Sequence, residues 1–278
     1  MTTTTTRTLD RESLPMVLWA KAKKLGIWNP ADIDLTRDRE DWLDLTDQER
    51  ETLLHLTTLF AGGEEAVTVD LLPLIATIAA EGRIEEEIYL TSFLWEEAKH
   101  VDAFHRFLTE VADDSGDGSR FHSPSYQSLF FDELPTSLAD LRTDPSPAAQ
   151  ARASVTYNLI VEGVLAETGY HAYHAMLERN SIMPGMLEII GKLKTDESRH
   201  IAYGMHLLSR LVEEHGEEIW MVIQARMAEL LPLAIGVISE IFSRYDEMAF
   251  GLDLAEFTDF ATSQFESRFK RIERAVTR

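Results

Sequence analysis

Apolar residues recur three and four positions apart along most of the chain, which is the pattern of amphipathic helices. Thr46-Asp-Gln-Glu49 is typical of a capping box at the start of a helix, and Pro73 is expected to kink that helix. The pattern predicts a short helix over residues 14–24, long helices over 46–80, 84–112, 148–179 and 186–215, and two further helices over 217–244 and 254–276. Since no convincing alternating strand pattern occurs, we expect an all-α protein.

The four long helices are separated by connections of unequal length. Residues 113–147 are rich in Asp, Ser, Gly and Pro, with short helices expected around residues 125–134 and near Leu138. Two helical hairpins joined by one long crossover have the connectivity of ferritin-like bundles. We therefore predict a ferritin-like four-helix bundle core with additional N- and C-terminal helices, in a single domain over residues 1–278. Residues 1 to about 12 are expected to be disordered.

Composition narrows the classes of partner. The 278 residues are 45% hydrophobic, enough for a large core, and the net charge of -22 argues against nucleic acid as a partner. Cysteine is absent, which excludes disulfides and thiolate metal sites. The longest apolar run, residues 71–80, is too short to cross a bilayer, so we expect no transmembrane segment. The start of the chain lacks a secretory signal, and we expect a cytoplasmic protein.

Two Glu-x-x-His motifs carry the candidate chemistry, Glu97 with His100 and Glu197 with His200. On a helix, residues three apart lie on one face, so each carboxylate and imidazole can bind one metal ion. A surface ion pair needs the same spacing, so neither motif is decisive alone.

The hairpins bring each motif opposite a further glutamate. Glu64 and Glu97 are 33 residues apart and centred beside the Gly82 break. Glu162 and Glu197 are 35 residues apart and centred beside the turn at residues 180–185. Residues equally far from a turn face each other across an antiparallel hairpin, so we expect each hairpin to pair one glutamate with one Glu-x-x-His.

The resulting set of donors is suited to two metal ions. Four carboxylates balance the charge of two divalent cations, whereas a lone carboxylate in the apolar run around Glu162 would be costly. One glutamate from each of two helices and Glu-x-x-His from each of the other two is the ligand set of di-iron and di-manganese carboxylate proteins. Zinc fits these donors but supplies no redox chemistry. The predicted ligands are Glu64, Glu97, His100, Glu162, Glu197 and His200.

Other candidates rank below these six. Glu65 adjoins Glu64 but faces small residues, and His105 is expected to point away from the site. Asp196 precedes Glu197 and could orient His100 through a carboxylate–imidazole hydrogen bond, or could equally be a solvated helix residue.

At these residues the chain resembles a known family, the R2-like ligand-binding oxidases, which are relatives of the ribonucleotide reductase small subunit. The resemblance covers about residues 46–215. The segments that carry it are Ala61-Gly-Gly-Glu-Glu-Ala-Val67, Trp95-Glu-Glu-Ala-Lys-His100, Tyr157-Asn-Leu-Ile-Val-Glu-Gly-Val-Leu-Ala-Glu-Thr-Gly-Tyr170 and Asp196-Glu-Ser-Arg-His200.

The resemblance implies a mixed manganese/iron cofactor, with di-iron as the alternative, and a bound long-chain fatty acid. It also implies dioxygen activation, a homodimer, and a two-electron oxidation that joins the oxygen of Tyr157 to the β-carbon of Val67. Val67 lies three residues after Glu64 and Tyr157 five before Glu162. If their two helices are antiparallel, both residues are displaced toward the same end of the metal site. A core valine beside a buried tyrosine is the simpler interpretation of such a pair.

Two other functions stay open. In a ribonucleotide reductase small subunit the radical tyrosine usually lies four residues beyond the first histidine ligand, where this chain has Phe104. A non-catalytic ferritin-like protein that binds metal or lipid is the other alternative. The oxidase hypothesis further predicts an apolar channel at the metal site, lined by residues after Glu162 and by the last helices.

Overall fold

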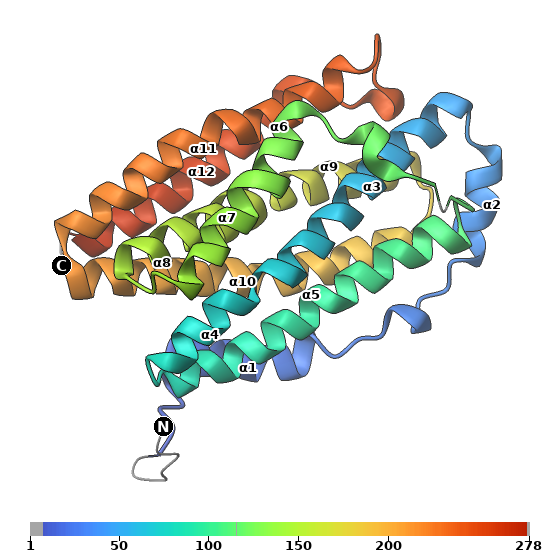
Figure 1. The fold of residues 1–278 in the computed structure, drawn as a ribbon. Helices are drawn as coiled ribbons and strands as arrows, with labels where there is room; N and C mark the ends of the chain where they lie inside the picture. Colours follow the sequence, from blue (N-terminus) through green and yellow to red (C-terminus); the bar gives the residue numbers. More distant parts are fainter. Residues whose placement is uncertain (1–7, 115, 277–278) are drawn as a thin grey trace.

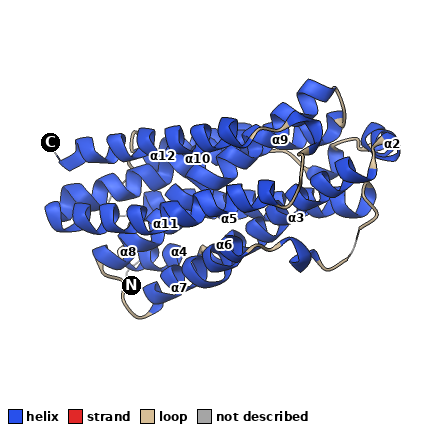
Figure 2. Ribbon diagram, turned by 90° about the horizontal axis from the view of Figure 1, so that it is seen from above, coloured by secondary structure: helices blue, strands red, loops and turns tan. Residues whose placement is uncertain are grey.

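The computed structural model describes residues 8–114 and 116–276, and over these residues it consists of helices and loops without strands. Figure 1 shows the helices packed as one elongated bundle, and Figure 2 shows the same arrangement from above. The all-α prediction is confirmed.

Four long helical segments form the centre of the bundle. Figure 1 shows α3 running antiparallel to α5, and α9 running antiparallel to α10, so each consecutive pair is a hairpin. The long crossover between the hairpins carries the short helices. The central elements are α3 (Asp47–Asp70), α5 (Ile84–Glu110), the π-helix η5 (Val155–Ala166) continuing into α9 (Glu167–Asn180), and α10 (Pro184–His215).

The remaining elements surround this centre. Helix α1 lies against α5 and α10, while α11 and α12 pack on η5 and on each other. The outer helices are α1 (Leu14–Leu25), α2 (Thr36–Asp44), α4 (Leu72–Ala80), α6 (Pro124–Gln127), α7 (Leu134–Ala139), α8 (Pro147–Ser154), α11 (Glu217–Ser243) and α12 (Leu254–Val276). Short 3-10 or π turns are η1 (Pro30–Asp32), η2 (Gly118–Phe121), η3 (Ser128–Glu133), η4 (Asp140–Arg142) and η6 (Ala249–Gly251).

The capping box and the proline predicted for the first hairpin both have their expected effects on its first helix. The Thr46 hydroxyl accepts from the Glu49 backbone N–H at 3.3 Å, and the Glu49 carboxylate accepts from the Thr46 N–H at 2.8 Å. This capping box begins α3. The predicted helix over residues 46–80 is interrupted at Leu71, two residues before Pro73, which separates α3 from α4.

The helix predicted over residues 148–179 forms, as α8, η5 and α9 in succession, but its middle part is not α-helical. Residues 155–166 form a π-helix, in which hydrogen bonds join residues five apart rather than four. Tyr157 and Glu162 therefore stack on one side of the segment, whereas an α-helix would turn them onto different faces. We see no residue pattern in this segment that predicts the change.

Helix α2 was not predicted, because its sequence is strongly charged and has little apolar periodicity. Two of its carboxylates are buried against the start of α10. Asp38 accepts from the backbone N–H groups of Gly185 and Met186 at 2.9 and 2.7 Å, and Asp41 accepts from that of Met183 at 2.7 Å. These acids satisfy otherwise unpaired donors at a helix N-terminus, where negative charge is also favoured.

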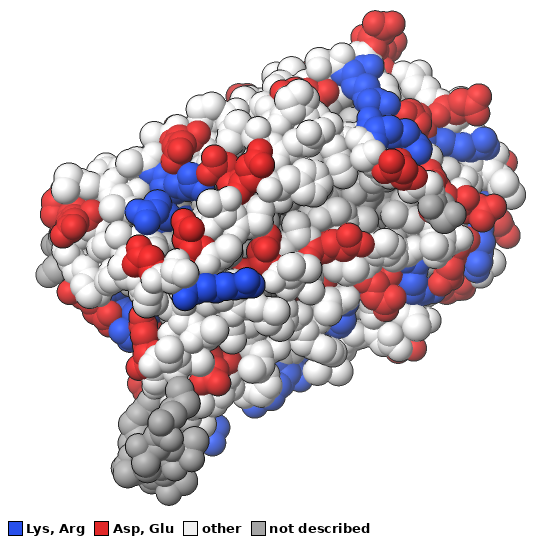
Figure 3. Space-filling view, viewed as in Figure 1, with Lys and Arg blue, Asp and Glu red and all other residues white. Residues whose placement is uncertain are grey.

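Helix α11 is long and apolar enough to cross a membrane by length and composition. In the bundle, 39% of its most apolar window is buried, and core helices of soluble proteins pass the same test. Figure 3 shows acidic and basic side chains interspersed over the face in view. Of the segment expected to be disordered, residues 1–7 lie outside the described residues, whereas the Asp10 N–H donates to Glu85 Oε1 at 3.0 Å.

Candidate metal centre

The structure brings all six predicted ligand side chains together in the middle of the bundle. Each of the six is at most 5% exposed. Their donor atoms fall into two overlapping groups in which every member lies within 4.8 Å of the others. The first group is Glu64 of α3, Glu97 and His100 of α5, and Glu197 of α10; the second is Glu97, Glu162 of η5, and His200 of α10.

The carboxylates of Glu97 and Glu197 lie between the two imidazoles. His100 Nδ1 lies 3.6 Å from Glu97 Oε2 and 3.4 Å from Glu197 Oε1. His200 Nδ1 lies 3.0 Å from Glu97 Oε1 and 3.7 Å from Glu197 Oε2. Each carboxylate thus presents one oxygen toward each histidine, which is the arrangement of ligands shared by two ions.

The other two glutamates are each close to one histidine. Glu64 Oε2 lies 3.4 Å from His100 Nδ1, and Glu162 Oε1 lies 3.8 Å from His200 Nδ1. The two sites therefore have similar donors but are built from different helices.

The chemistry of the cluster fits metal ions better than hydrogen bonds. Buried polar atoms are normally paired, because an unpaired one costs roughly 1–3 kcal/mol. Among the described residues, six buried atoms of the cluster have no hydrogen-bond partner, and a cation would satisfy them all: Oε1 and Oε2 of Glu97, Oε1 of Glu162, Oε2 of Glu197, and Nδ1 of His100 and His200.

The pKa values of the buried glutamates and histidines indicate a site that is stabilised by added positive charge. Burial raises the pKa of Glu64 to about 8 and also raises that of Glu162 well above its usual value. Burial alone would lower the pKa of both histidines, yet the surrounding carboxylates raise both. Bound cations would relieve the same repulsion without protons.

Each histidine is held from behind by a buried carboxylate. His100 Nε2 lies 3.4 Å from Asp196 Oδ2, and His200 Nε2 lies 2.9 Å from Glu96 Oε2. Both carboxylates are completely buried, so Asp196 is not a solvated residue. With Nε2 occupied, each ring turns Nδ1 toward the cluster.

Glu96 was missed by the sequence reasoning, although a signal for it exists. Asp196 immediately precedes the Glu197–His200 motif, and Glu96 holds the same place before Glu97 and His100. In the structure each of these acids contacts the histidine of the other motif.

One arginine ties the two acids together. Arg199 Nη2 lies 2.7 Å from Glu96 Oε1 and also donates to Asp196 Oδ1, and the arginine is only 2% exposed. Asp196 further accepts from Lys99 Nζ at 3.1 Å and from Trp28 Nε1 at 2.9 Å. We call these residues, Trp28, Glu96, Lys99, Asp196 and Arg199, the ionic network.

Tyr157 and Val67 meet beside the cluster. The hydroxyl of Tyr157 lies 3.4 Å from the backbone oxygen of Val67, and both residues are buried. Burial raises the pKa of Tyr157 well above the usual value of a phenol. The neighbouring ligands are also fixed, because Asn158 donates to Glu162 at 3.0 Å and Tyr170 donates to Glu64.

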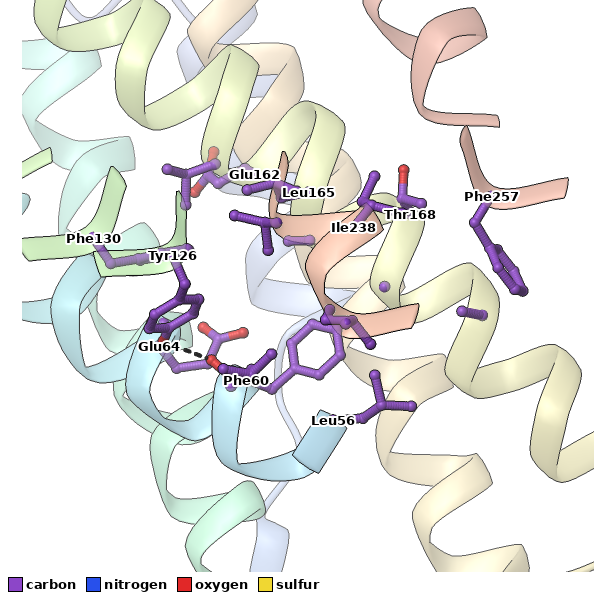
Figure 4. A pocket seen from close by; sticks show the side chains of 18 of the residues that line it. Leu56, Phe60, Glu64, Tyr126, Phe130, Glu162, Leu165, Thr168, Ile238 and Phe257 are labelled. Atoms are coloured by element: carbon purple, nitrogen blue, oxygen red, sulfur yellow. Dashed lines mark hydrogen bonds between the residues drawn. The ribbon is translucent and has the colours of Figure 1, made fainter. Parts of the chain in front are cut away.

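A pocket of about 930 Å³, including its open mouth, extends from the carboxylates. Figure 4 shows Glu64 and Glu162 on one side of it and Phe257 on the far side. Its walls are mostly apolar and come mainly from α3, η3, η5, α9, α11 and the start of α12, which includes the elements where the channel was expected. Wall residues include Leu56, Phe60, Val67, Phe130, Leu165, Ala172, Ile238, Ile241 and Phe257.

The lower-ranked candidates lie elsewhere. The Glu65 side chain is 56% exposed, and its Oε1 lies 2.7 Å from Nε2 of the half-exposed His105. Both residues lie outside the cluster. Phe104 is completely buried and stacks on Phe60, with ring centroids 5.2 Å apart.

Known proteins share both the sequence pattern and the fold. The family model for the ribonucleotide reductase small chain matches residues 16–273. Three solved structures are variants of R2-like ligand-binding oxidase with an anaerobically reconstituted Mn/Fe cofactor. A valine-to-leucine variant is 36% identical with a TM-score of 0.92, covering 98% of this chain and 97% of its own. A tyrosine-to-phenylalanine variant is 37% identical with a TM-score of 0.91 and the same coverage. A glycine-to-leucine variant is 37% identical with a TM-score of 0.91, covering 95% of each chain.

Proposed function

The chain belongs to the R2-like ligand-binding oxidases, within the ribonucleotide reductase small-chain family, and from this premise we propose that it is an oxidoreductase that uses a manganese–iron pair to activate dioxygen. The observation that carries the proposal is the buried cluster of four glutamates and two histidines with unpaired donor atoms. When bound, the reduced metal pair supplies electrons to dioxygen and oxidising power toward a nearby C–H or O–H bond.

Glu64 with His100 would hold one ion and Glu162 with His200 the other. Glu97 and Glu197, each close to both histidines, would serve as ligands for either ion. Hard carboxylate oxygens and imidazoles suit both manganese and iron. Because the cluster is almost fully buried, access is restricted to molecules that enter the pocket.

We further propose that the pocket binds a long-chain fatty acid with its carboxylate toward the metals. Apolar walls with polar groups gathered at one end match an amphiphile, and small-molecule sites are typically lined in this way. Four glutamates would repel a further carboxylate, so binding of the head group requires the metal charge. Protein without metals should therefore bind the fatty acid poorly.

The proposed reaction of the protein itself is an ether bond between Tyr157 and Val67. Tyr157 loses its phenolic hydrogen and Val67 the hydrogen on its β-carbon, and the two electrons released pass to dioxygen. The closeness of the two buried residues supports this pairing. Positioning decides which bond is attacked, and Val67 shares a helix face with Glu64, one turn away.

Peptide mass spectrometry tests the proposal directly. Protein loaded with manganese and iron in air should yield a cross-linked pair of peptides that is two hydrogens lighter than their sum. Protein loaded without oxygen should lack the pair.

Tyr157→Phe is the matched control and should bind metals without forming the bond. Separate, unmodified peptides from aerobic, metal-replete protein would overturn the cross-link and favour a reductase subunit or a non-catalytic binding protein. A homodimer and a cytoplasmic location stay predictions.

A further inference from the structure

Two buried tyrosines, Tyr89 of α5 and Tyr203 of α10, pack against each other outside the lining of the pocket. Tyr89 and Tyr203 are both completely buried, with ring centroids 5.3 Å apart. Neither lines the pocket, and neither has a part in the function proposed above.

The rings form a continuous path to a metal ligand. Tyr89 lies 6.1 Å from Phe93, and Phe93 stacks on His200 with centroids 3.7 Å apart. Helical spacing aligns the path, because Tyr89 and Phe93 are four residues apart on α5, and His200 and Tyr203 three apart on α10. Aromatic rings in such close succession allow an electron to move between Tyr203 and the metal site.

The two tyrosines differ in what can receive the phenolic proton. Among the described residues the Tyr89 hydroxyl has no hydrogen-bond partner. The Tyr203 hydroxyl donates to Glu86 Oε2 at 2.9 Å, within the range for proton transfer. Oxidation of a phenol greatly increases its acidity, so a nearby carboxylate makes Tyr203 easier to oxidise than Tyr89.

Glu86 is suited to hold that proton. It is 5% exposed, and burial raises the pKa of its carboxyl despite Arg210, whose Nε lies 3.2 Å from Glu86 Oε1. Arg210 and Arg83 both contact Glu214, which is 38% exposed at its side chain. The path thus ends beside a charged cluster that reaches the surface.

We propose that Tyr203 is a redox-active site that drains unused oxidising equivalents from the metal centre. Tyr203 gives one electron toward the centre through Tyr89 and Phe93, and its phenolic proton to Glu86. A neutral tyrosyl radical and a protonated Glu86 result, and an external one-electron reductant such as ascorbate restores both.

The inference rests on the proposed function, because dioxygen at the metal centre is the oxidant. It places the radical away from Phe104, which packs on Phe60. Such a drain protects the ligands when the reaction does not consume the oxidant. It should therefore be most active when the cross-link cannot form.

The test is freeze-quench electron paramagnetic resonance of Tyr157→Phe protein, metal-loaded and mixed with oxygen. A transient tyrosyl signal should appear, and ring-deuterated tyrosine should narrow it. Adding Tyr203→Phe or Glu86→Gln should reduce its yield at least about tenfold, because the electron donor or the proton acceptor is lost. Metal content and circular dichroism establish that each variant is folded and loaded.

Tyr173→Phe is the matched control. Tyr173 is also completely buried, but its hydroxyl pairs with the neutral Thr57 hydroxyl at 2.7 Å, so the signal should persist. Loss of the signal in this control, or its persistence in Tyr203→Phe, would overturn the assignment. If wild type forms the cross-link but Tyr157→Phe gives no radical, the inference fails and the oxidase function stands. If wild type consumes no oxygen, both fail.

Discussion

Toward α11 and α12 the metal-ligand cluster opens onto apolar walls, whereas toward α1 it is backed by buried charges. The apolar side offers an entering molecule little to bind except the four carboxylates. The other side holds Glu96 and Asp196 between Arg199 and Lys99, all at most 7% exposed. The metal-ligand cluster therefore has one side suited to binding a small molecule and another side that fixes the orientation of the ligands.

The two sides of the cluster differ in what they provide: one orients the histidine ligands and the other shapes access to the metals. Histidine orientation depends on the ionic side, because Nε2 of each ring meets a carboxylate there. In the function proposed above, selectivity would depend on the apolar side, because the pocket would decide which bond lies nearest the metals. Changes on the two sides should thus have separable effects, while changes in the shared ligands should remove both functions.

The largest effect is expected from the cluster itself. His200→Ala should lower bound metal below two ions per chain, because losing a ligand weakens binding by more than the roughly 10–100-fold typical of losing a ligand's partner. Elemental analysis measures the metal and circular dichroism the helix content, which should not change. His105→Ala is the control. Full occupancy in His200→Ala would remove this residue from the site.

The next largest effect is expected on the ionic side. Arg199→Met should lower the free energy of unfolding by about 3–5 kcal/mol, because it leaves buried carboxylates without their shared partner. It should also reduce metal binding at both sites. Arg199→Lys keeps the positive charge but loses the planar guanidinium that can contact both acids, so we expect a smaller decrease in the free energy of unfolding than in Arg199→Met. Urea denaturation measures the effect. The exposed Arg152→Met should change stability by less than about 0.5 kcal/mol, and an equally small change in Arg199→Met would contradict the role of the network.

The smallest effect on stability is expected on the apolar side. Ala172→Phe adds a ring to the pocket wall and should occupy space that the fatty acid needs. Co-purifying fatty acid, measured by denaturing extraction and mass spectrometry, should fall several-fold while metal content is unchanged. Ala20→Phe on the exposed side of α1 is the control. Unchanged lipid in Ala172→Phe would place the ligand elsewhere, whereas combined loss of lipid and metal would show that the two sides are not separable.

Much of the site could be predicted because its signals are periodic. Carboxylate and imidazole three residues apart share a helix face, and positions equally far from a turn oppose each other. Glu64 and Glu162 could therefore be selected as partners of the two Glu-x-x-His motifs. Glu96 shows a limit of this reasoning, because its place before Glu97 was visible but an acidic residue on a helix is usually exposed.

The sequence by itself determined most of the long helices, their order, and the six residues that meet at the centre, because hydrophobic periodicity and spacing from turns are local properties. Tertiary structure alone decided which side chain holds which. Asp38 caps a helix that begins 146 residues later, and Arg199 joins acids from two helices. The π-helix, which brings Tyr157 onto the same side of the segment as Glu162, also appeared only in the tertiary structure. Each of these features depends on buried contacts between segments far apart in the sequence, and local sequence patterns do not reveal the energies of such contacts.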